Sequence, residues 1–515
     1  MAPKEILWID DEIEMLKPHL MLLERRCYHV DQALSGSDGL AMLEEKRYDV
    51  VFLDENMPGL SGVETLHRIR QAWPMQHVVM VTKSDEEDLM NQAIAGQIAD
   101  YLIKPVNPNQ ILLVLKKLFD SDQIIGEATL TGYREAYPSI AQRLNGRLSY
   151  EEWVALYKEL VHWSLKIESY SPDLKELLEL QQREAEQLFS RFVMEHYAHW
   201  MRNADERPTM SPDLLKRFLF PLLDKGEKVF LLIIDNFRYD QWLSVKDLVA
   251  DRFTVDETLY MSILPTATQY ARNALFSGMM PSEIAKHYPA LWVNEDREEG
   301  KNDHEEELLR ELLARHKRGC SLSYNKVLEA DFGEKLVQQL DQLKKNRLNV
   351  VVINFVDMLS HARTESKMIR ELAPDEAAYR SLTRSWFSHS TMMPMLHKIA
   401  DMGYKILLST DHGTVRVTKP VKVVGDKHLS TNLRYKWGKN MSYNEKEVFE
   451  ISKPEAFGLP RRAVTDRYIF SRESDFFAYP NNFNYYVSYY RNTFQHGGIS
   501  FEEMLVPIVQ LTPKA

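Results

Sequence analysis

The sequence contains few cysteines and no long hydrophobic run. Only Cys27 and Cys320 occur among 515 residues, which excludes a disulfide framework and a cysteine-rich zinc site. The longest apolar runs, such as residues 229–234 and 350–353, are far shorter than the roughly 20 residues that span a bilayer. The N-terminus also lacks the apolar stretch and cleavage site of an export signal. We therefore expect a soluble, cytoplasmic protein without a transmembrane segment.

Positive charge is also in deficit, because 64 basic residues against 75 acidic residues give a net charge of −11. This balance opposes a protein that coats nucleic acid through a general positive field. No helix-turn-helix pattern with a basic recognition helix follows residue 120, so we rank direct DNA binding last. The hydrophobic content of 44% is sufficient for sizeable cores, and the length allows about three or four domains.

The first 120 residues alternate short apolar runs with amphipathic helical patterns. The apolar runs predict strands at residues 6–9, 28–33, 50–53, 78–81 and 101–103. Helical patterns lie between them, for example at residues 15–26 and 64–70. This alternation predicts βαβ units and one α/β domain with a doubly wound parallel sheet.

Residues 121–225 carry almost no strand signal and are predicted to form a helical connector. Ser149 and Glu152 form a capping-box pattern at a helix start. From Leu174 to about Trp200, apolar residues keep helical spacing within a charged sequence, which predicts an amphipathic helix. Plain packing explains its apolar face, and a dimer seam or a signal-transmitting lever is the alternative.

Strand and helix patterns alternate again in residues 226–515. We predict strands at residues 228–234, 259–263, 349–355 and 405–409. Polar residues follow the carboxyl ends of these strands, where ligands bind in open α/β sheets. We therefore interpret this zone as the catalytic domain. The acid-rich segment 295–307 is predicted to be an exposed insertion without a chemical role.

Three carboxylates follow strands of the first domain. Asp10 and Asp11 follow the first predicted strand and Asp54 follows the third, so the topology brings them to one sheet edge. Such a cluster repels itself unless it binds a hard cation, and Mg²⁺ suits it. The fourth strand leads to the hydroxyl of Thr82 and the fifth to the ammonium of Lys104.

This set of residues resembles the receiver domain of two-component response regulators, and the resemblance covers the first 120 residues. It implies a CheY-like fold and phosphorylation of Asp54 by a histidine kinase. It also implies a set of supporting roles: Mg²⁺ held by Asp10, Asp11 and Asp54 with the backbone of Asn56, phosphoryl contact by Lys104, and a switch formed by Thr82 and Tyr101. Phosphorylation would add anionic oxygens that Thr82 and Lys104 grip, and so change the face that carries Tyr101.

A second group of metal-ligand residues occupies the C-terminal zone. Carboxylates and imidazoles follow its apolar strands in the order Asp235, Asp357, His361, Asp411, His412 and His496. Mixed carboxylate and imidazole ligation suits zinc, although manganese accepts the same ligands. Two ions about 3.5 to 4 Å apart stabilise the attacking and leaving oxygens of an in-line displacement. The six residues therefore predict a two-metal site.

Thr266 and Thr268 compete for the role of nucleophile beside this site. Both lie in the segment that leads from a strand into the helical pattern 269–276. Free amides at a helix N-terminus favour an anionic phosphorus centre. A threonine hydroxyl is a weak nucleophile, so it needs a base or a metal to become an alkoxide.

The ordered set, together with the His496-Gly497-Gly498 tail, resembles the PglZ branch of the alkaline phosphatase superfamily over roughly residues 210–515. The resemblance implies an α/β/α domain with two zinc ions, one held by Asp357, His361 and His496, the other by Asp235, Asp411 and His412. It also implies Thr268 as the nucleophile that contacts the metals, since the family's nucleophile directly precedes the helix at a fixed distance from a small-residue–Gly pair, here Ser277-Gly278. The Cys/Ser-x-Pro-x-Arg context of sulfatases is absent at this point, so we favour phosphodiester hydrolysis.

Substrate contacts are open to two interpretations. Either role is possible for a first group: its members supply positive charge around a nucleotide backbone, or they are simply solvated surface residues. This group is Arg272, Lys427, His428 and Arg434. A group of tyrosines either stacks on bases or packs within a strand, and we favour strand packing. This group is Tyr485, Tyr486, Tyr489 and Tyr490.

The order of receiver, helical connector and PglZ domain resembles a family of response regulators associated with type IX secretion and gliding motility. The resemblance implies a membrane sensor histidine kinase as partner, homodimerisation on phosphorylation, and a zinc phosphodiesterase acting on linear or cyclic oligonucleotides. The alternative is a non-catalytic, phosphorylation-dependent scaffold that binds secretion-motor proteins or a sigma factor.

Overall fold

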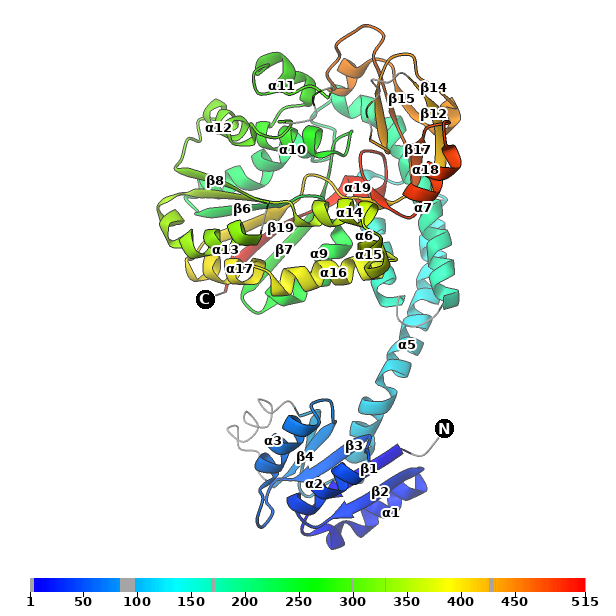
Figure 1. The fold of residues 1–515 in the computed structure, drawn as a ribbon, viewed down its shortest axis with the longest axis vertical. Helices are drawn as coiled ribbons and strands as arrows, with labels where there is room; N and C mark the ends of the chain where they lie inside the picture. The colour runs from blue at the N-terminus through cyan, green and yellow to red at the C-terminus, as the bar shows by residue number, and fades with distance from the viewer. Residues whose placement is uncertain are drawn as a thin grey trace. The chain divides into compact units, whose positions relative to one another are not determined.

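The computed structural model describes residues 4–83, 98–167, 172–295, 297, 300–328, 330–425, 430 and 432–514. The chain divides into two compact units, Met1–Thr131 and Gly132–Ala515 (Figure 1). Within the described residues, no helix combines the length and the apolar character that crossing a membrane requires.

The first unit is built on a five-stranded parallel sheet of order β2-β1-β3-β4-β5. Its strands are β1 (Lys4–Ile9), β2 (Tyr28–Ala33), β3 (Val50–Asp54), β4 (Val78–Thr82) and β5 (Asp100–Ile103). The helices α1 (Lys17–Arg25), α2 (Gly36–Glu45) and α3 (Gly62–Ala72) alternate with them. Side chains alternate between the two faces, so Trp8 and Phe52 belong to one apolar cluster and Leu7 and Leu53 to another. The predicted doubly wound domain is confirmed.

Three long helices connect this sheet to the second one: α5 (Pro108–Leu144), α6 (Tyr150–Ile167) and α7 (Pro172–Arg202). The predicted capping box is present, since the Glu152 amide donates to Ser149 Oγ and the Ser149 amide donates to Glu152 Oε2. Buried residues on α7 recur with helical spacing, among them Leu178, Phe189 and Tyr197. From Gly132 onward these helices belong to the same compact unit as the C-terminal domain.

The second unit contains a six-stranded sheet of order β7-β19-β10-β6-β9-β8, in which β19 is antiparallel to its neighbours. The strands are β6 (Val229–Ile234), β7 (Phe253–Met261), β8 (Leu322–Val327), β9 (Leu348–Ile353), β10 (Lys405–Ser409) and β19 (Leu505–Pro513). Every residue of β6 and β9 is buried, as expected for a sheet covered on both faces.

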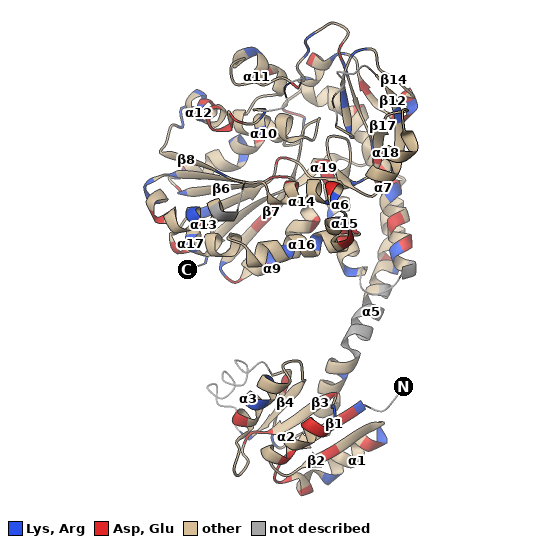
Figure 2. Ribbon diagram, viewed as in Figure 1, with Lys and Arg blue, Asp and Glu red and all other residues tan. Residues whose placement is uncertain are grey.

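Helices cover both faces of this sheet (Figure 1). On one side lie α9 (Tyr239–Ala250), α13 (Ala330–Gln339), α16 (Glu376–His389) and α17 (Met392–Asp401), and on the other α10 (Thr268–Ser277) and α12 (Glu305–Arg315). Charged residues lie mostly on these outer helices and leave the central strands nearly free of charge (Figure 2). The α/β/α architecture agrees with the prediction.

Three smaller sheets, β11-β18, β14-β12-β17 and β13-β16-β15, lie beside the main one. The remaining elements are α8 (Phe220–Asp224), α11 (Pro281–His287), α14 (Phe355–Glu365), α15 (Lys367–Leu372), β11 (Val415–Arg416), β12 (Lys419–Val424), β13 (Tyr435–Gly438), β14 (Ser442–Tyr443), β15 (Phe449–Ile451), β16 (Arg467–Phe470), β17 (Asp475–Ala478), α18 (Phe483–Tyr490), β18 (Phe494–Gln495) and α19 (Phe501–Met504).

The tyrosine-rich segment before His496 is helix α18, so the prediction of a strand is wrong. Phe483, Val487 and Tyr490 pack against a small apolar cluster that contains Val415 and Phe476. Their spacing of four and three residues is that of one helix face. Tertiary packing therefore overrides the strand preference of tyrosine and valine here.

Candidate functional site

The receiver carboxylates meet at the carboxyl edge of the first sheet. Asp10 follows β1, Asp54 ends β3, and Lys104 follows β5. Lys104 Nζ lies 2.8 Å from Asp10 Oδ2 and 2.8 Å from Asp54 Oδ1. Asp10, Asp11 and Asp54 each offer an oxygen within 4.8 Å of the others. The structure thus brings together the predicted acidic pocket and its lysine.

One lysine does not balance three carboxylates at this edge. Burial raises the pKa of Asp54, and Asp10 and Asp11 add to this effect, although Lys104 opposes it. A hard divalent cation would remove the repulsion, so the donor set fits Mg²⁺. Asn56 is exposed beside the cluster, and the Thr82 hydroxyl donates to Glu55. Tyr101 is 39% exposed on β5, and the switch role of Thr82 and Tyr101 stays a prediction.

The second site collects residues from four segments at the carboxyl edge of the main sheet. Asp235 follows β6, Asp357 and His361 lie on α14 after β9, and the Asp411-His412 pair follows β10. His496 follows β18, directly beyond the last residue of that strand. Two groups of ligand atoms result, each within 4.8 Å, formed by Asp357, His361 and His496 and by Asp235, Asp411 and His412. These are the two triads implied by the resemblance.

The Thr268 hydroxyl, at the first residue of α10, faces the second triad. Its Oγ1 lies 3.1 Å from His412 Nε2 and 3.4 Å from Asp235 Oδ1. The His412 ring stacks on His496 of the first triad, with centroids 4.3 Å apart. The two triads are therefore adjacent, and of the two candidate threonines it is Thr268 whose hydroxyl faces the second triad.

Thr266 has a different environment, because it anchors the loop that carries His496. Its hydroxyl donates to the Gly498 carbonyl at 2.9 Å and accepts from the Gly497 amide at 3.0 Å. With Nδ1 protonated, His496 donates to the Thr266 carbonyl at 3.1 Å. This bond leaves Nε2 of His496 free as a metal ligand. In the same way His412 Nδ1 lies 3.1 Å from the Gly413 carbonyl.

The electrostatics of the triads favour a bound divalent cation. Burial and the neighbouring Asp235 raise the pKa of Asp411 well above its usual range, and burial raises that of Asp357. Burial and the nearby His412 lower the pKa of His496 to about 4. Asp411 Oδ2 is buried and has no hydrogen-bond partner among the described residues. Neutral imidazoles and an unsatisfied carboxylate oxygen are the donors that zinc accepts.

Arg272 lies behind the ligands instead of on the surface. It is 1% exposed, and its guanidinium lies 2.6 Å from Asp235 Oδ2 and 2.6 Å from Glu305 Oε1. This positive charge outweighs burial and lowers the pKa of Asp235. The prediction that residues 295–307 form an exposed insertion without a role is wrong at Glu305, which is 1% exposed and also accepts from Tyr324. Arg272 therefore positions a ligand, and neither surface solvation nor direct substrate contact describes it.

Of the other three predicted substrate contacts, Arg434 lies among the described residues. Arg434 is fully buried, and its Nε donates to Glu503 Oε1 at 3.1 Å. The expectation of a surface cation is therefore wrong for Arg434, because the guanidinium is used inside the fold. Lys427 and His428 lie outside the described residues.

Sequence reasoning missed contacts from the connector to both catalytic loops. The buried Tyr197 hydroxyl on α7 accepts from the Leu264 amide at 2.9 Å, in the loop that leads to Thr268. Glu186 Oε1, also on α7, accepts from the Phe501 amide at 2.8 Å, just after the His496 loop. The Phe501 ring stacks on connector rings, with centroids 4.3 Å from Phe189 and 5.0 Å from Tyr157. The helical spacing of these aromatic residues was visible, but their partners were not.

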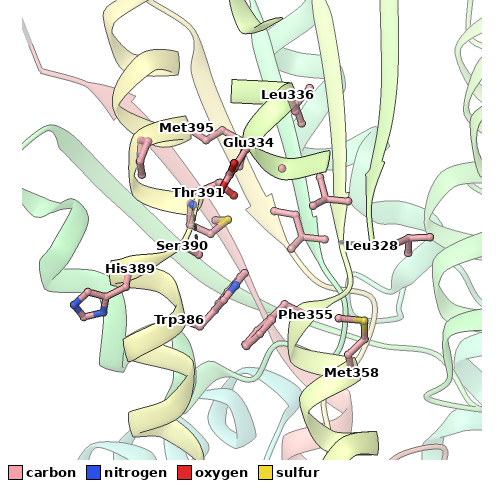
Figure 3. Close-up of a pocket in the computed structure, with 15 residues that line it drawn as sticks. Leu328, Glu334, Leu336, Phe355, Met358, Trp386, His389, Ser390, Thr391 and Met395 are labelled. Atoms are coloured by element: carbon pink, nitrogen blue, oxygen red, sulfur yellow. Dashed lines mark hydrogen bonds between the residues drawn. The ribbon is translucent and has the colours of Figure 1, made fainter. Parts of the chain in front are cut away.

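A cavity of about 430 Å³ lies between α13, α14, α16 and α17 (Figure 3). Phe355 and Met358 enter it from α14, and Phe355 stacks on Trp386 of α16 with centroids 4.5 Å apart. The lining contains none of the residues predicted to bind metal or to act as nucleophile. Chemistry is therefore best assigned to the two triads and not to this largely apolar cavity.

Three segments of the chain match known families. Residues 6–116 match the response regulator receiver domain, and residues 123–201 match the PorX response regulator linker domain. Residues 214–511, more than half of the chain, match the BREX system PglZ alkaline phosphatase-like domain.

Three individual relatives are similar to about a fifth to a quarter of this chain, a share that corresponds to the receiver part. Transcriptional regulatory protein ResD of Bacillus subtilis is 35% identical over 116 residues, which cover 22% of this chain and 47% of ResD. Alginate biosynthesis transcriptional regulatory protein AlgB of Pseudomonas putida is 33% identical over 119 residues, 23% of this chain and 27% of AlgB. The matched segment thus spans less than half of either relative. The solved chemotaxis protein CheY4 of Vibrio cholerae is 27% identical, with 23% of this chain and all of that chain covered and a TM-score of 0.22.

The matched segments follow one another along the chain in the order receiver, PorX-type linker and PglZ domain. The receiver match contains the acidic pocket around Asp54, and the PglZ match contains both triads. The chain therefore belongs to the PglZ family of alkaline phosphatase-like proteins and carries an N-terminal response regulator receiver joined through a PorX-type linker.

Proposed function

We propose that the PglZ domain is a zinc-dependent phosphodiesterase with Thr268 as its nucleophile. One observation carries the proposal: two carboxylate–imidazole triads converge beside a single threonine hydroxyl at a helix N-terminus. A purely structural zinc site is normally closed and has no use for a hydroxyl facing it. The arrangement supports in-line displacement at phosphorus.

Each triad has the donor set for one zinc ion. When bound, the two ions would supply Lewis acidity, lower the pKa of the threonine hydroxyl and stabilise the leaving oxygen. Asp235 and His412 hold Thr268 Oγ1 in place. The hydroxyl gives its proton to solvent as its oxygen forms a bond to phosphorus. The bond from phosphorus to the leaving oxygen breaks, and that oxygen takes a proton from water and departs as the alcohol. Water then hydrolyses the phosphothreonine, and the free amides at the start of α10 favour the anionic phosphorus centre throughout.

The proposed substrate class is a phosphodiester, with short linear or cyclic oligonucleotides as the physiological form. The test is hydrolysis of bis(p-nitrophenyl) phosphate by the purified full-length chain with added zinc. We expect Thr268→Ala to abolish turnover and Thr268→Ser to retain part of it, with unchanged thermal unfolding in both. Turnover that persists in Thr268→Ala would remove Thr268 from the mechanism, and an inactive wild-type protein with bound zinc would favour the scaffold alternative.

The receiver is proposed to be phosphorylated on Asp54 by a membrane sensor histidine kinase and to promote homodimerisation. Support comes from the receiver match and from the Lys104 contact with Asp54. The PorX-type linker match supports a role in type IX secretion and gliding motility, with secretion-motor proteins and a sigma factor as candidate partners. Beryllium fluoride should shift the wild-type chain toward dimer in light scattering, and Asp54→Asn should not respond.

A further inference from the structure

Helix α18, which ends six residues before His496, presents an exposed aromatic ladder. Tyr485 is 64% exposed and Tyr486 is 37% exposed. Tyr485 stacks on Tyr489 one turn later, with centroids 6.2 Å apart and ring planes 16° from parallel. Phe483, Val487 and Tyr490 already provide the packing that holds the helix. The outward-facing rings therefore have no role in the core, and large exposed aromatic surface marks a binding site.

Arginines beside this ladder lack carboxylate partners. The Arg370 guanidinium of α15 lies 5.5 Å from the centroid of the Tyr489 ring and donates to the Thr364 carbonyl. Arg363 donates to the carbonyls of Ala373, Pro374 and Asn492, none of which carries a charge. Within the described chain, the Nε atoms of Arg370 and Arg416 are buried without a hydrogen-bond partner. Arg363 is 1% exposed and its guanidinium is used inside the fold, so the guanidiniums suited to phosphate oxygens are those of Arg370 and Arg416.

The aromatic ladder and the arginines are continuous with the candidate active site. Arg363 lies two residues after His361 on α14, and His361 has a 64% exposed side chain. The Arg363 guanidinium bonds the Asn492 carbonyl just after α18, and Gln495 Nε2 lies 3.4 Å from Thr364 Oγ1 of α14. α15 and α18 lie on the same flank of the C-terminal unit (Figure 1). A polymer lying along α18 would thus reach the C-terminal part of α14, where Arg363 lies two residues beyond His361.

We propose that α15, α18 and the β11–β18 pair form a binding platform for a single-stranded oligonucleotide, with bases on Tyr485 and Tyr489 and phosphates near Arg370 and Arg416. Stacked tyrosines combined with cations are the pattern by which single strands are held without sequence preference. The positive charge of the arginines selects a polyanion over a neutral apolar peptide. This inference rests on the proposed function, because the bound strand is the substrate of the same site.

Equilibrium binding of a fluorescent oligothymidylate of about ten nucleotides tests the platform without turnover. Full-length Thr268→Ala serves as the parent, and Tyr485→Ala/Tyr489→Ala is added to it. We expect affinity to fall at least about fivefold for each ring lost, whereas the matched Tyr485→Phe/Tyr489→Phe pair keeps the wild-type affinity. Arg416→Gln should weaken binding and reduce its salt dependence. Thermal unfolding checks that each variant is folded. If the double variant is unfolded, binding by the single variant Tyr485→Ala provides the test instead.

The outcomes separate this inference from the phosphodiesterase proposal. In the Thr268 background, weaker oligothymidylate binding after ring removal supports the platform even if wild-type protein cleaves no phosphodiester. Equal affinity of the alanine pair and the parent, or no binding by the parent, overturns the platform. A loss in the phenylalanine pair as large as in the alanine pair also overturns it, because stacking would then not be the cause.

Discussion

Removal of the Arg272 side chain charge should strongly destabilise the metal-free second unit. The guanidinium is 1% exposed and joins two carboxylates that are equally buried, Asp235 and Glu305, at 2.6 Å each. In Arg272→Met both carboxylates lose their partner in a region of low dielectric. Breaking a buried ion pair costs about 3–5 kcal/mol. We expect a loss of this size in the chelator-treated protein, or a melting temperature lower by at least roughly 5 °C.

Thermal denaturation in chelator and in zinc provides the assay, with the transition of the second unit followed separately. Zinc should recover part of the loss, because a cation on the Asp235 triad replaces the missing charge. Arg310→Met is the matched control, since its partner Glu306 lies at 2.6 Å but both side chains are exposed. That change should alter stability by less than about 1 kcal/mol. If Arg272→Met is no more costly than Arg310→Met, the buried network is not what orders the metal ligands.

The following predictions concern other parts of the molecule. Tyr197→Phe removes the acceptor for the Leu264 amide, so kcat for bis(p-nitrophenyl) phosphate should fall about two- to tenfold with KM unchanged, and equal kinetics would contradict the positioning role. In the receiver, burial raises the pKa of Asp54 above its unfolded value, so the native state binds more protons and metal-free stability should fall as pH rises from about 4. Urea denaturation at several pH values measures this, and Asp54→Asn should make the free energy of unfolding depend less on pH. An unchanged pH dependence would refute the role of Asp54. Thr266→Val should weaken zinc binding by about tenfold in competition with a chelating dye, since the His496 loop loses its anchor.

The convergence of the carboxylates was predictable from the strand pattern, whereas their division into two triads came from the resemblance to the PglZ branch. Parallel strands end at one sheet edge, so Asp235, Asp357 and Asp411 had to meet once the strands were recognised. The inward turn of Glu305 was not predictable, since an acid-rich segment gives no sign of which carboxylate is buried. Arg272 was misread for a related reason: its partners are 37 and 33 residues away in sequence. Buried polar pairs leave no periodic pattern.

Helix α18 shows the opposite case, in which the signal was present and a stronger one concealed it. Four tyrosines and a valine favour a strand by side-chain type. The i, i+4 and i+7 spacing of Phe483, Val487 and Tyr490 indicates a helix, and packing against one apolar cluster decides in its favour. Tyr485 is exposed on this helix. Its exposure does not distinguish the two structures, because every second residue of a half-buried strand is also exposed. Residue type alone therefore could not separate a packed strand from a binding helix.

The connector is best understood as part of the catalytic unit. α7 bonds the Leu264 amide through Tyr197 and the Phe501 amide through Glu186, so one rigid helix holds the loops of Thr268 and His496. A displacement of α7 along its axis would strain both bonds at once, because packed cores shift between discrete arrangements instead of deforming smoothly. The plain-packing interpretation of its apolar face and the lever interpretation are therefore compatible. The contacts that bury the face are the ones through which movement of the connector would reach the proposed nucleophile Thr268 and the proposed metal ligand His496 together.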